Sequence, residues 1–193
     1  MNTEFEERIL EVDVEKMTEK LISLGATKVG EWYQKRYVYD FNPKRENEWI
    51  RLRDTGDEIT LTYKNVEKNS VDGTKELEVA VHDFEKTNEM LKILGYTPKA
   101  FQENKRIRYM LNGVEVDIDS WPLIPTYMEI EGSNLEEVKA IEKLLEVELS
   151  KITVLNCQDI YEDIYGIDIT KIKELRFEWK RGLNKNGNAY FDW

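Results

Sequence analysis

The sequence predicts an α+β fold in which a closed eight-stranded antiparallel β-barrel is surrounded by helices. Short segments in which apolar and charged residues alternate with a period of two recur along the chain, as in strands whose two faces meet different surroundings. Turn-length links join these segments, which favours antiparallel neighbours. Closing the sheet into a barrel removes the exposed edges that an open sheet leaves.

The alternating segments place the strands in chain order. The polar face of seven of them carries Glu4, Glu6 and Arg8; Arg51 and Arg53; Thr60, Thr62 and Lys64; Glu76 and Glu78; Arg106 and Arg108; Asp117 and Asp119; Glu129 and Glu131. An eighth strand is expected at Lys35–Phe41. Turn sequences such as Asp54-Thr55-Gly56 and Asn112-Gly113 separate neighbouring strands.

Three helices are expected between the strands. Asp13–Leu24 and Asp83–Leu94 each begin at an aspartate that can cap the helix, and each is followed by a glycine. The third runs from about Leu135 to Glu148, where Ser133 and Glu136 have the spacing of a capping box.

The composition limits the functions that this fold can serve. The 193 residues include 28 Lys+Arg and 39 Asp+Glu, a net charge of −11, which argues against binding to nucleic acid or to an anionic membrane surface. Met1–Leu10 is charged and periodic, unlike a signal peptide, and no apolar run is long enough to span a bilayer, so a cytoplasmic protein is expected. One cysteine, Cys157, excludes an intrachain disulfide, and one histidine, His82, argues against a histidine-centred active site.

The charged strand faces admit two interpretations. They face water in a half-solvated open sheet, or they face each other inside the barrel. A merely solvated face would mix Ser, Thr, Gln and Lys, whereas this one consists mainly of eight acids and six bases in two-residue steps, which favours the inside. Buried charges are costly unless they pair or bind a ligand.

The two signs of charge together indicate the ligand. Arginines bind phosphate oxygens through paired hydrogen bonds, and clustered carboxylates bind Mg²⁺ or Mn²⁺. Two such ions carry about +4 and a triphosphate about −4 to −5, so the filled cavity would keep nearly its empty charge. The sequence therefore predicts a metal-polyphosphate site. Lys35, Arg36 and Lys105 are equally compatible with reaching the substrate and with lying on a solvated face.

These residues resemble the CYTH superfamily, the triphosphate tunnel metalloenzymes, which includes class IV adenylate cyclases, thiamine triphosphatases and inorganic tripolyphosphatases. The resemblance covers roughly residues 1–150 and depends on the order of several motifs. They are Glu4-Phe5-Glu6-Glu7-Arg8, with Arg8 where the family has lysine, and the segments WIRLRD, LTYK, ELEV, KRIRY and DIDSWPLIPTYMEIEG.

The resemblance implies a tunnel in which residues of opposite charge have separate roles. The metal ligands would be Glu4, Glu6, Asp119, Glu129 and Glu131, and the triphosphate would be bound by Arg8, Arg51, Arg53, Lys64, Arg106 and Arg108. Arg8 and Lys64 are the expected catalytic residues, although an arginine at position 8 cannot serve in proton transfer as a lysine can. Supporting tunnel acids would be Glu76, Glu78 and Asp117.

The resulting functional prediction is a metal-dependent triphosphatase with a small anionic substrate. Residues 1–150 would form the barrel and 151–193 an extension packed on it. Two alternatives stay open, a class IV-type adenylate cyclase and a barrel that binds polyphosphate or nucleotide without catalysis. The oligomeric state also stays open, a homodimer included.

Overall fold

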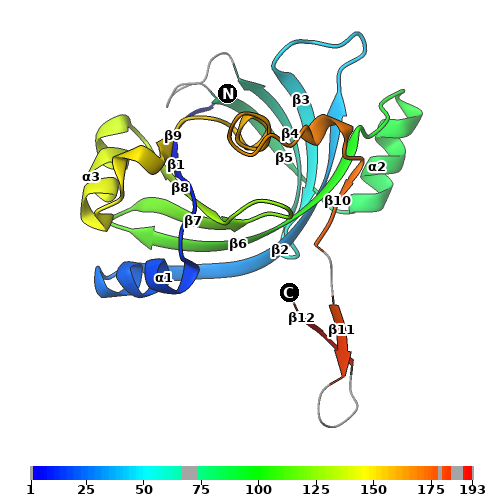
Figure 1. The fold of residues 1–193 in the computed structure, drawn as a ribbon. Coiled ribbons are helices and arrows are strands. Elements are labelled where there is room, and N and C mark those ends of the chain that lie inside the picture. The colour runs from blue at the N-terminus through cyan, green and yellow to red at the C-terminus, as the bar shows by residue number, and fades with distance from the viewer. Residues whose placement is uncertain (1, 67–73, 178–179, 184–188, 193) are drawn as a thin grey trace.

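A curled antiparallel sheet forms the body of the protein (Figure 1). The computed structural model describes the backbone of residues 2–66, 74–177, 180–183 and 189–192, and the side chains of 5–66 and 74–177. The main strands are β1 (Asn2–Ile9), β2 (Thr27–Asp40), β3 (Glu48–Asp54), β4 (Ile59–Val66), β5 (Thr74–Val81), β6 (Ala100–Leu111), β7 (Val114–Ser120) and β8 (Tyr127–Gly132).

The strand pairings follow the order β6-β2-β3-β4-β5-β1-β8-β7, and β7 pairs in turn with β6. All of these pairings are antiparallel. The seam between β1 and β5 is short, with Asn2 opposite Glu76, Thr3 opposite Lys75 and Glu4 opposite Thr74. The predicted α+β fold class is confirmed, and the expected strand Lys35–Phe41 is the second half of the longer β2.

Three helices pack outside this sheet: α1 (Val14–Ser23), α2 (Phe84–Ile93) and α3 (Leu135–Leu145). Asp13 and Asp83 cap the first two as expected, accepting hydrogen bonds from the backbone N–H groups of Lys16 and Lys86.

The start and end of α3 differ from the prediction. Asn134, not Ser133, is the cap, and its side chain accepts from Glu137 N at 2.9 Å. The Glu137 carboxylate in turn accepts from Ser133 N at 2.9 Å, so the capping interactions begin one residue later than expected. Glu146 adopts a left-handed conformation with φ 55°, which ends the helix before Glu148.

The apolar core lies between the helices and the outer face of the sheet. Leu21 of α1 and Ile141 of α3 pack in one cluster with Ile118 of β7 and Ile130 of β8, all four nearly inaccessible to water. Phe84 of α2 belongs to a second cluster on the outer face of β2 and β3. Because the apolar faces point outward to the helices, the opposite face of each strand is left for polar side chains inside the curl.

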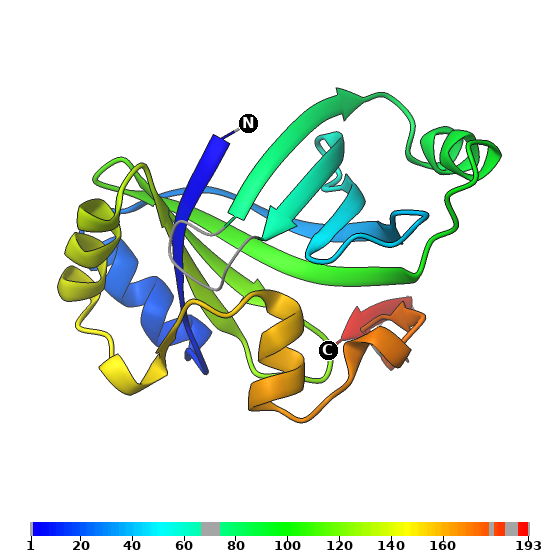
Figure 2. The same cartoon turned by 90° about the horizontal axis from the view of Figure 1, so that it is seen from above.

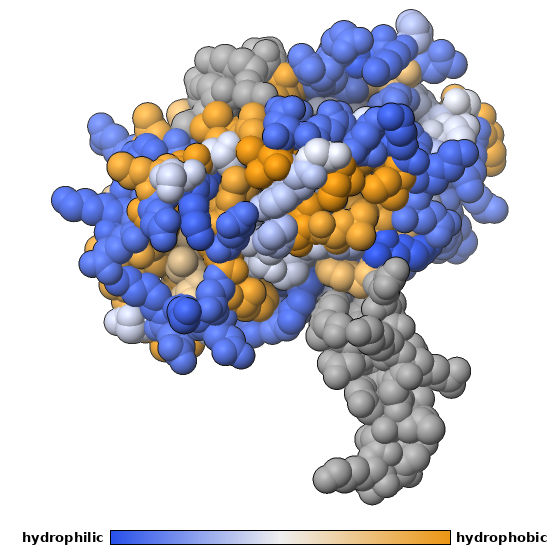
Figure 3. Space-filling model, in the orientation of Figure 1, coloured by the Kyte–Doolittle hydropathy of each residue, from blue (hydrophilic) through white to orange (hydrophobic). Residues whose placement is uncertain are grey.

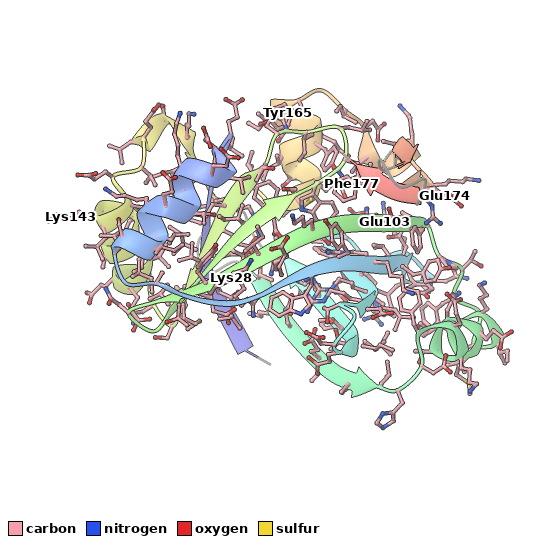
Figure 4. The ribbon with its side chains drawn as sticks, turned by 90° about the horizontal axis from the view of Figure 1, so that it is seen from below. Lys28, Glu103, Lys143, Tyr165, Glu174 and Phe177 are labelled. Carbon is pink, nitrogen blue, oxygen red and sulfur yellow. The ribbon has the colours of Figure 1, made fainter. Side chains whose placement is uncertain are left out.

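The chain after α3 continues along the barrel. It contains η1 (Leu149–Lys151), β9 (Ile152–Thr153), α4 (Cys157–Asp159), η2 (Ile160–Ile164), η3 (Ile169–Lys171), β10 (Glu174–Leu175), and the separate hairpin strands β11 (Lys180–Leu183) and β12 (Ala189–Asp192). β9 pairs with β1, and β10 pairs in parallel with β6, where Glu174 and Phe177 lie beside Glu103 (Figure 4).

The segment formed by α4 and η2, here called the end cap (Cys157–Ile164), crosses one end of the barrel (Figures 1 and 2). Ile160 and Tyr161 are fully buried, and the Tyr161 hydroxyl donates to the Pro122 carbonyl at 2.5 Å. Viewed from the same direction as Figure 1, the surface of the molecule shows hydrophobic patches among hydrophilic residues (Figure 3). Among the described helices, none is long and apolar enough to cross a membrane.

A buried acid pair joins α3 to β1 on the outside of the barrel. Lys139 contacts the carboxylates of Glu7 and Glu142, both of which are only 5% exposed. Burial, together with the neighbouring Glu7 carboxyl, raises the pKa of Glu142 from 4.5 to about 7. A carboxyl whose pKa is raised by folding stabilises the fold below pH 4.5, and this contribution is lost as the pH rises through 7.

We therefore expect Glu142→Gln to flatten the pH dependence of stability between pH 5 and pH 8. The variant should gain roughly 1 kcal/mol relative to the wild type at pH 8, a value discounted for water and Lys139 near the carboxyl. Urea unfolding at both pH values measures this. The exposed Glu136→Gln is the matched control on the same helix, and an equal pH dependence in wild type and Glu142→Gln would contradict the prediction.

Candidate functional site

A polar cavity of about 960 Å³ occupies the inside of the barrel. The period-two alternation of the strands brings the predicted charged residues to it, because one face of each strand already packs on the helices. The predicted residues that line it are Glu6, Arg8, Arg51, Arg53, Lys64, Glu76, Glu78, Arg106, Arg108, Asp119, Glu129 and Glu131. Asp117 is buried beside Arg106 and Arg108, and the side chain of Glu4 lies outside the described residues.

Arg8 lies between two carboxylates on the β1–β8 side of the cavity. Its Nη2 is 2.8 Å from Glu6 Oε2 and 2.7 Å from Glu129 Oε2, while its Nη1 donates to the Leu155 carbonyl at 3.0 Å. Burial works against the charge of Arg8, but Glu129 and Glu6 outweigh burial and hold its pKa above the usual value. The arginine at this position is thus held through both terminal nitrogens, whereas its buried Nε has no hydrogen-bond partner among the described residues.

Arg106 forms the second centre of this acid-rich side. Its Nε and Nη2 donate to Asp119 at 2.8 and 2.5 Å. Nη2 also lies 3.3 Å from Glu129, and Nη1 lies 2.6 Å from Asp117. Burial raises the pKa of Glu129, but Arg8 and Arg106 dominate and lower it to about 2. Arg108 binds Asp117 at 2.8 and 2.7 Å and also contacts Glu115.

The opposite side of the cavity, on β2 and β3, carries excess positive charge. Arg36 of β2 is directly opposite Arg53 of β3, and Arg51 follows on the same face of β3. Glu78 contacts Arg51 at 3.4 Å and Arg53 at 3.6 Å, but its side chain is 36% exposed. Repulsion from Arg51, followed by burial, lowers the pKa of Arg53 to about 8. Arg51 also lies 3.8 Å from Glu76, so the described carboxylates beside these arginines are Glu76 and Glu78.

Lys64 lies at the junction of the two sides. It forms an ion pair with Glu76, which is directly opposite it on β5. Thr74, two residues earlier on β5, donates its hydroxyl to Glu6 at 3.3 Å. The proximity places Lys64 within the charged network, and the catalytic roles of Lys64 and Arg8 stay predictions.

The sequence left open whether three further cations reach the cavity, and the structure shows that one of them does. Arg36 lines the cavity, whereas Lys35 Nζ lies 3.2 Å from Asp54 and 4.9 Å from the centre of the Phe84 ring, and Lys105 pairs with Glu31. The sequence of β2 could have predicted this difference, because Lys35 lies on the same face of the strand as the aromatic residues that pack outside the barrel. Arg36, the next residue, then lies on the opposite face, which lines the cavity.

The segment after β9 contributes residues that the sequence did not predict. They are Asn156, Cys157, Gln158, Asp159, Ile169 and Thr170. Burial raises the pKa of the Cys157 thiol to about 11, so it is not an activated nucleophile. Trp121 also lines the cavity, with Arg36 stacked on its ring at 4.6 Å.

The carboxylates on the acid-rich side offer the oxygen donors of a site for a hard divalent metal ion, although in this structure arginines of the chain form ion pairs with them. Glu6 lies directly opposite Glu131, and Arg8 opposite Glu129, so inward carboxylates of adjacent strands meet here. Among the side chains described, no three acids form a ready-made metal cluster. The guanidinium of Arg8 stands where Glu6 and Glu129 offer oxygens to a cation, which is the donor type that Mg²⁺ and Mn²⁺ prefer.

Comparison with known proteins identifies this arrangement. The model of the CYTH domain matches residues 37–160. This chain belongs to the CYTH family. The resemblance expected from the motifs is thereby confirmed.

Individual proteins resemble this chain in sequence or in fold. A Methanocaldococcus jannaschii protein named as a candidate adenylate cyclase is 27% identical over 150 residues, which cover 75% of this chain and 84% of the relative. A conserved hypothetical protein from Pyrococcus furiosus has a TM-score of 0.70 at 22% identity, covering 80% of this chain and 98% of that one. A Hippeastrum protein, described as a candidate adenylyl cyclase with a dominant triphosphatase activity, has a TM-score of 0.56 at 13% identity, covering 86% and 97%.

The two sides of this CYTH cavity should respond oppositely to loss of an arginine. Arg106→Gln removes the paired arginine of the buried Asp119 and one cation contact each from Asp117 and Glu129, and should reduce the free energy of unfolding by about 3–5 kcal/mol. The reduction should be smaller at pH 5 than at pH 8, because stranded carboxyls take up protons more readily. Arg53→Gln relieves repulsion among cations and should leave the stability unchanged or higher. Urea titrations of both variants measure this, and equal losses would contradict the charge division.

Proposed function

We propose that this chain is a divalent-metal-dependent phosphohydrolase that acts on the triphosphate of tripolyphosphate or of a nucleoside or other organic triphosphate. The observation that carries the proposal is the division of charge across the cavity. Arg36, Arg51 and Arg53 gather on one side, where repulsion from Arg51 lowers the pKa of Arg53 to about 8, while carboxylates gather on the other. A linked chain of phosphates supplies anions that these clustered guanidinium groups can bind.

The residues of the cationic side would bind and orient the substrate. Arg51 and Arg53 lie two residues apart on one face of β3, so their guanidinium groups can contact neighbouring phosphates. Phosphoryl transfer depends chiefly on such positioning and on neutralising negative charge, rather than on covalent chemistry by the protein. Fixed guanidinium donors in a buried cavity supply both effects.

The residues of the acidic side would hold the metal. Glu6, Glu129 and Glu131, with Asp119 beside them and Glu4 preceding them on β1, have the oxygen donors for Mg²⁺ or Mn²⁺. When bound, the metal would neutralise phosphate oxygens and polarise the bond to be broken. Arg8 keeps Glu6 and Glu129 aligned and cannot act as a base, so its part is to position these carboxylates and to attract the substrate.

Adenylate cyclase activity is the second candidate, favoured by the name of the Methanocaldococcus jannaschii relative. Triphosphate hydrolysis and the cyclisation of ATP both require that the three phosphates are bound, and they differ in which phosphorus atom is attacked. The triphosphatase is preferred because the Hippeastrum protein, although named as a candidate adenylyl cyclase, is described by a dominant triphosphatase activity.

A parallel assay separates the candidates. The purified protein with Mg²⁺ or Mn²⁺ is given tripolyphosphate, ATP and thiamine triphosphate, and orthophosphate, cyclic AMP and pyrophosphate are measured. We expect metal-dependent orthophosphate release that EDTA abolishes. Cyclic AMP with pyrophosphate would instead establish a cyclase, and tight binding without any product would establish a binding barrel.

The metal assignment is tested by removing two carboxylate charges. Glu6→Gln with Glu131→Gln should lower the metal-dependent rate by about 10²-fold or more, because the expected metal loses two anionic ligands. Steady-state rates over a range of Mn²⁺ concentrations measure this, with circular dichroism to check the fold. Glu89→Gln on the exposed side of α2 is the matched control. A double variant with unchanged activity would overturn the assignment.

A further inference from the structure

Arg36 is a buried cation without a counter-ion. Its side chain lies inside the barrel on β2 and the residue is 8% exposed, yet among the described residues no carboxylate lies within ion-pair distance of it. Its Nη2 instead donates to two neutral amide oxygens, those of Gln34 at 3.1 Å and of Asn104. Amide dipoles offset only part of the cost of burying a charge.

The nearest acid cannot supply the missing charge. Asp119 is reached only through Asn104, whose Nδ2 donates to Asp119 Oδ1 at 3.4 Å. Asp119 is already bound by Arg106 through two hydrogen bonds. The charges that act most strongly on Arg36 are those of Arg51 and Arg106, which add to burial in lowering its pKa to about 10.

Two buried donors at this place also lack acceptors. Nε of Arg36 and Nε1 of Trp121 have no hydrogen-bond partner among the described residues. Trp121 is 6% exposed, lines the same cavity, and supports the guanidinium at 4.6 Å from its ring. A buried donor left unpaired costs free energy, and two together on one cavity wall point to an acceptor-rich ligand.

The location restricts which part of a ligand can reach these donors. Trp121 packs in one apolar cluster with Ile160 and Tyr161 of the end cap, and Cys157 at its start lines the cavity near Arg36. The end cap crosses the barrel at this end (Figure 2). With the end cap on this side, a phosphate bound here is the end of its chain when any organic group points toward the other side of the cavity.

We propose that Arg36 and Trp121 form a subsite for the terminal phosphate of the substrate, with Arg36 Nε and Trp121 Nε1 donating to its oxygens. This subsite deepens the proposed function and rests on it. It selects triphosphates that end in a free phosphate, such as tripolyphosphate or a nucleoside triphosphate. A dinucleoside triphosphate, whose chain carries a nucleoside at both ends, should be rejected because a nucleoside cannot replace the dianionic terminus.

The test measures stability and affinity in the same variants, in EDTA so that no metal contributes. Arg36→Met should leave the unliganded protein as stable as the wild type or more so, because it removes an uncompensated buried charge. It should weaken tripolyphosphate binding by roughly tenfold or more in calorimetric titrations, the usual effect of losing charged hydrogen bonds. It should also reduce the preference for ATP over a dinucleoside triphosphate.

Arg176→Met is the matched control. Arg176 likewise stacks on an aromatic ring, that of Phe101 at 3.9 Å, but it is paired with Glu103 and Glu174 and does not line the cavity. Its loss should leave tripolyphosphate affinity unchanged. Trp121→Phe, which keeps the ring and removes Nε1–H, should weaken binding while leaving the fold intact.

The outcomes are distinguishable. Equal tripolyphosphate affinity in wild type and Arg36→Met would overturn the subsite while leaving the proposed function in place. A large loss of stability in unliganded Arg36→Met, with affinity retained, would show that Arg36 serves the fold alone. Failure of the wild-type chain to bind tripolyphosphate both in EDTA and with Mn²⁺ would overturn the proposed function and the subsite together.

Discussion

Charges of both signs are buried inside a barrel whose apolar packing lies on its outer face, and the rest of the structure depends on how those charges are satisfied. Helices α1, α2 and α3 cover the outside, so the inner faces of the strands cannot form an apolar core. Ionised side chains in such a place are tolerated only with partners. Arg8 and Arg106 meet this condition through carboxylates on β1, β7 and β8, which ties these strands together across the cavity.

On the other side of the cavity three arginines lie close to one another. Arg36, Arg51 and Arg53 crowd together, and the depressed pKa of Arg53, about 8, records their mutual repulsion. Such an arrangement weakens the unliganded fold and strengthens binding of an anion, because the ligand removes a repulsion that already exists. Stability and affinity are therefore opposed in this half of the cavity, as expected where function requires charges that the fold does not need.

The chain beyond α3 is connected to the same network. Arg8 donates to the Leu155 carbonyl, β9 pairs with β1 beside it, and the end cap packs against Trp121. The segment after α3 therefore contacts residues on both the acidic side and the cationic side of the cavity. The C-terminal segment thus contacts Arg8 through Leu155 and the surroundings of Arg36 through the end cap.

The sequence by itself determined the local features. Period-two alternation assigned each strand's inner face, so the inward position of residues such as Glu6, Arg53 and Lys64 was predictable, and the aspartate caps located α1 and α2. Only the tertiary structure decided which charges are paired: Arg8 with Glu6 and Glu129, and Arg36 with no carboxylate among the side chains that the structure describes. The reason is that the face of a strand follows from neighbouring residues, whereas ion pairing depends on the register between strands that lie far apart in the chain.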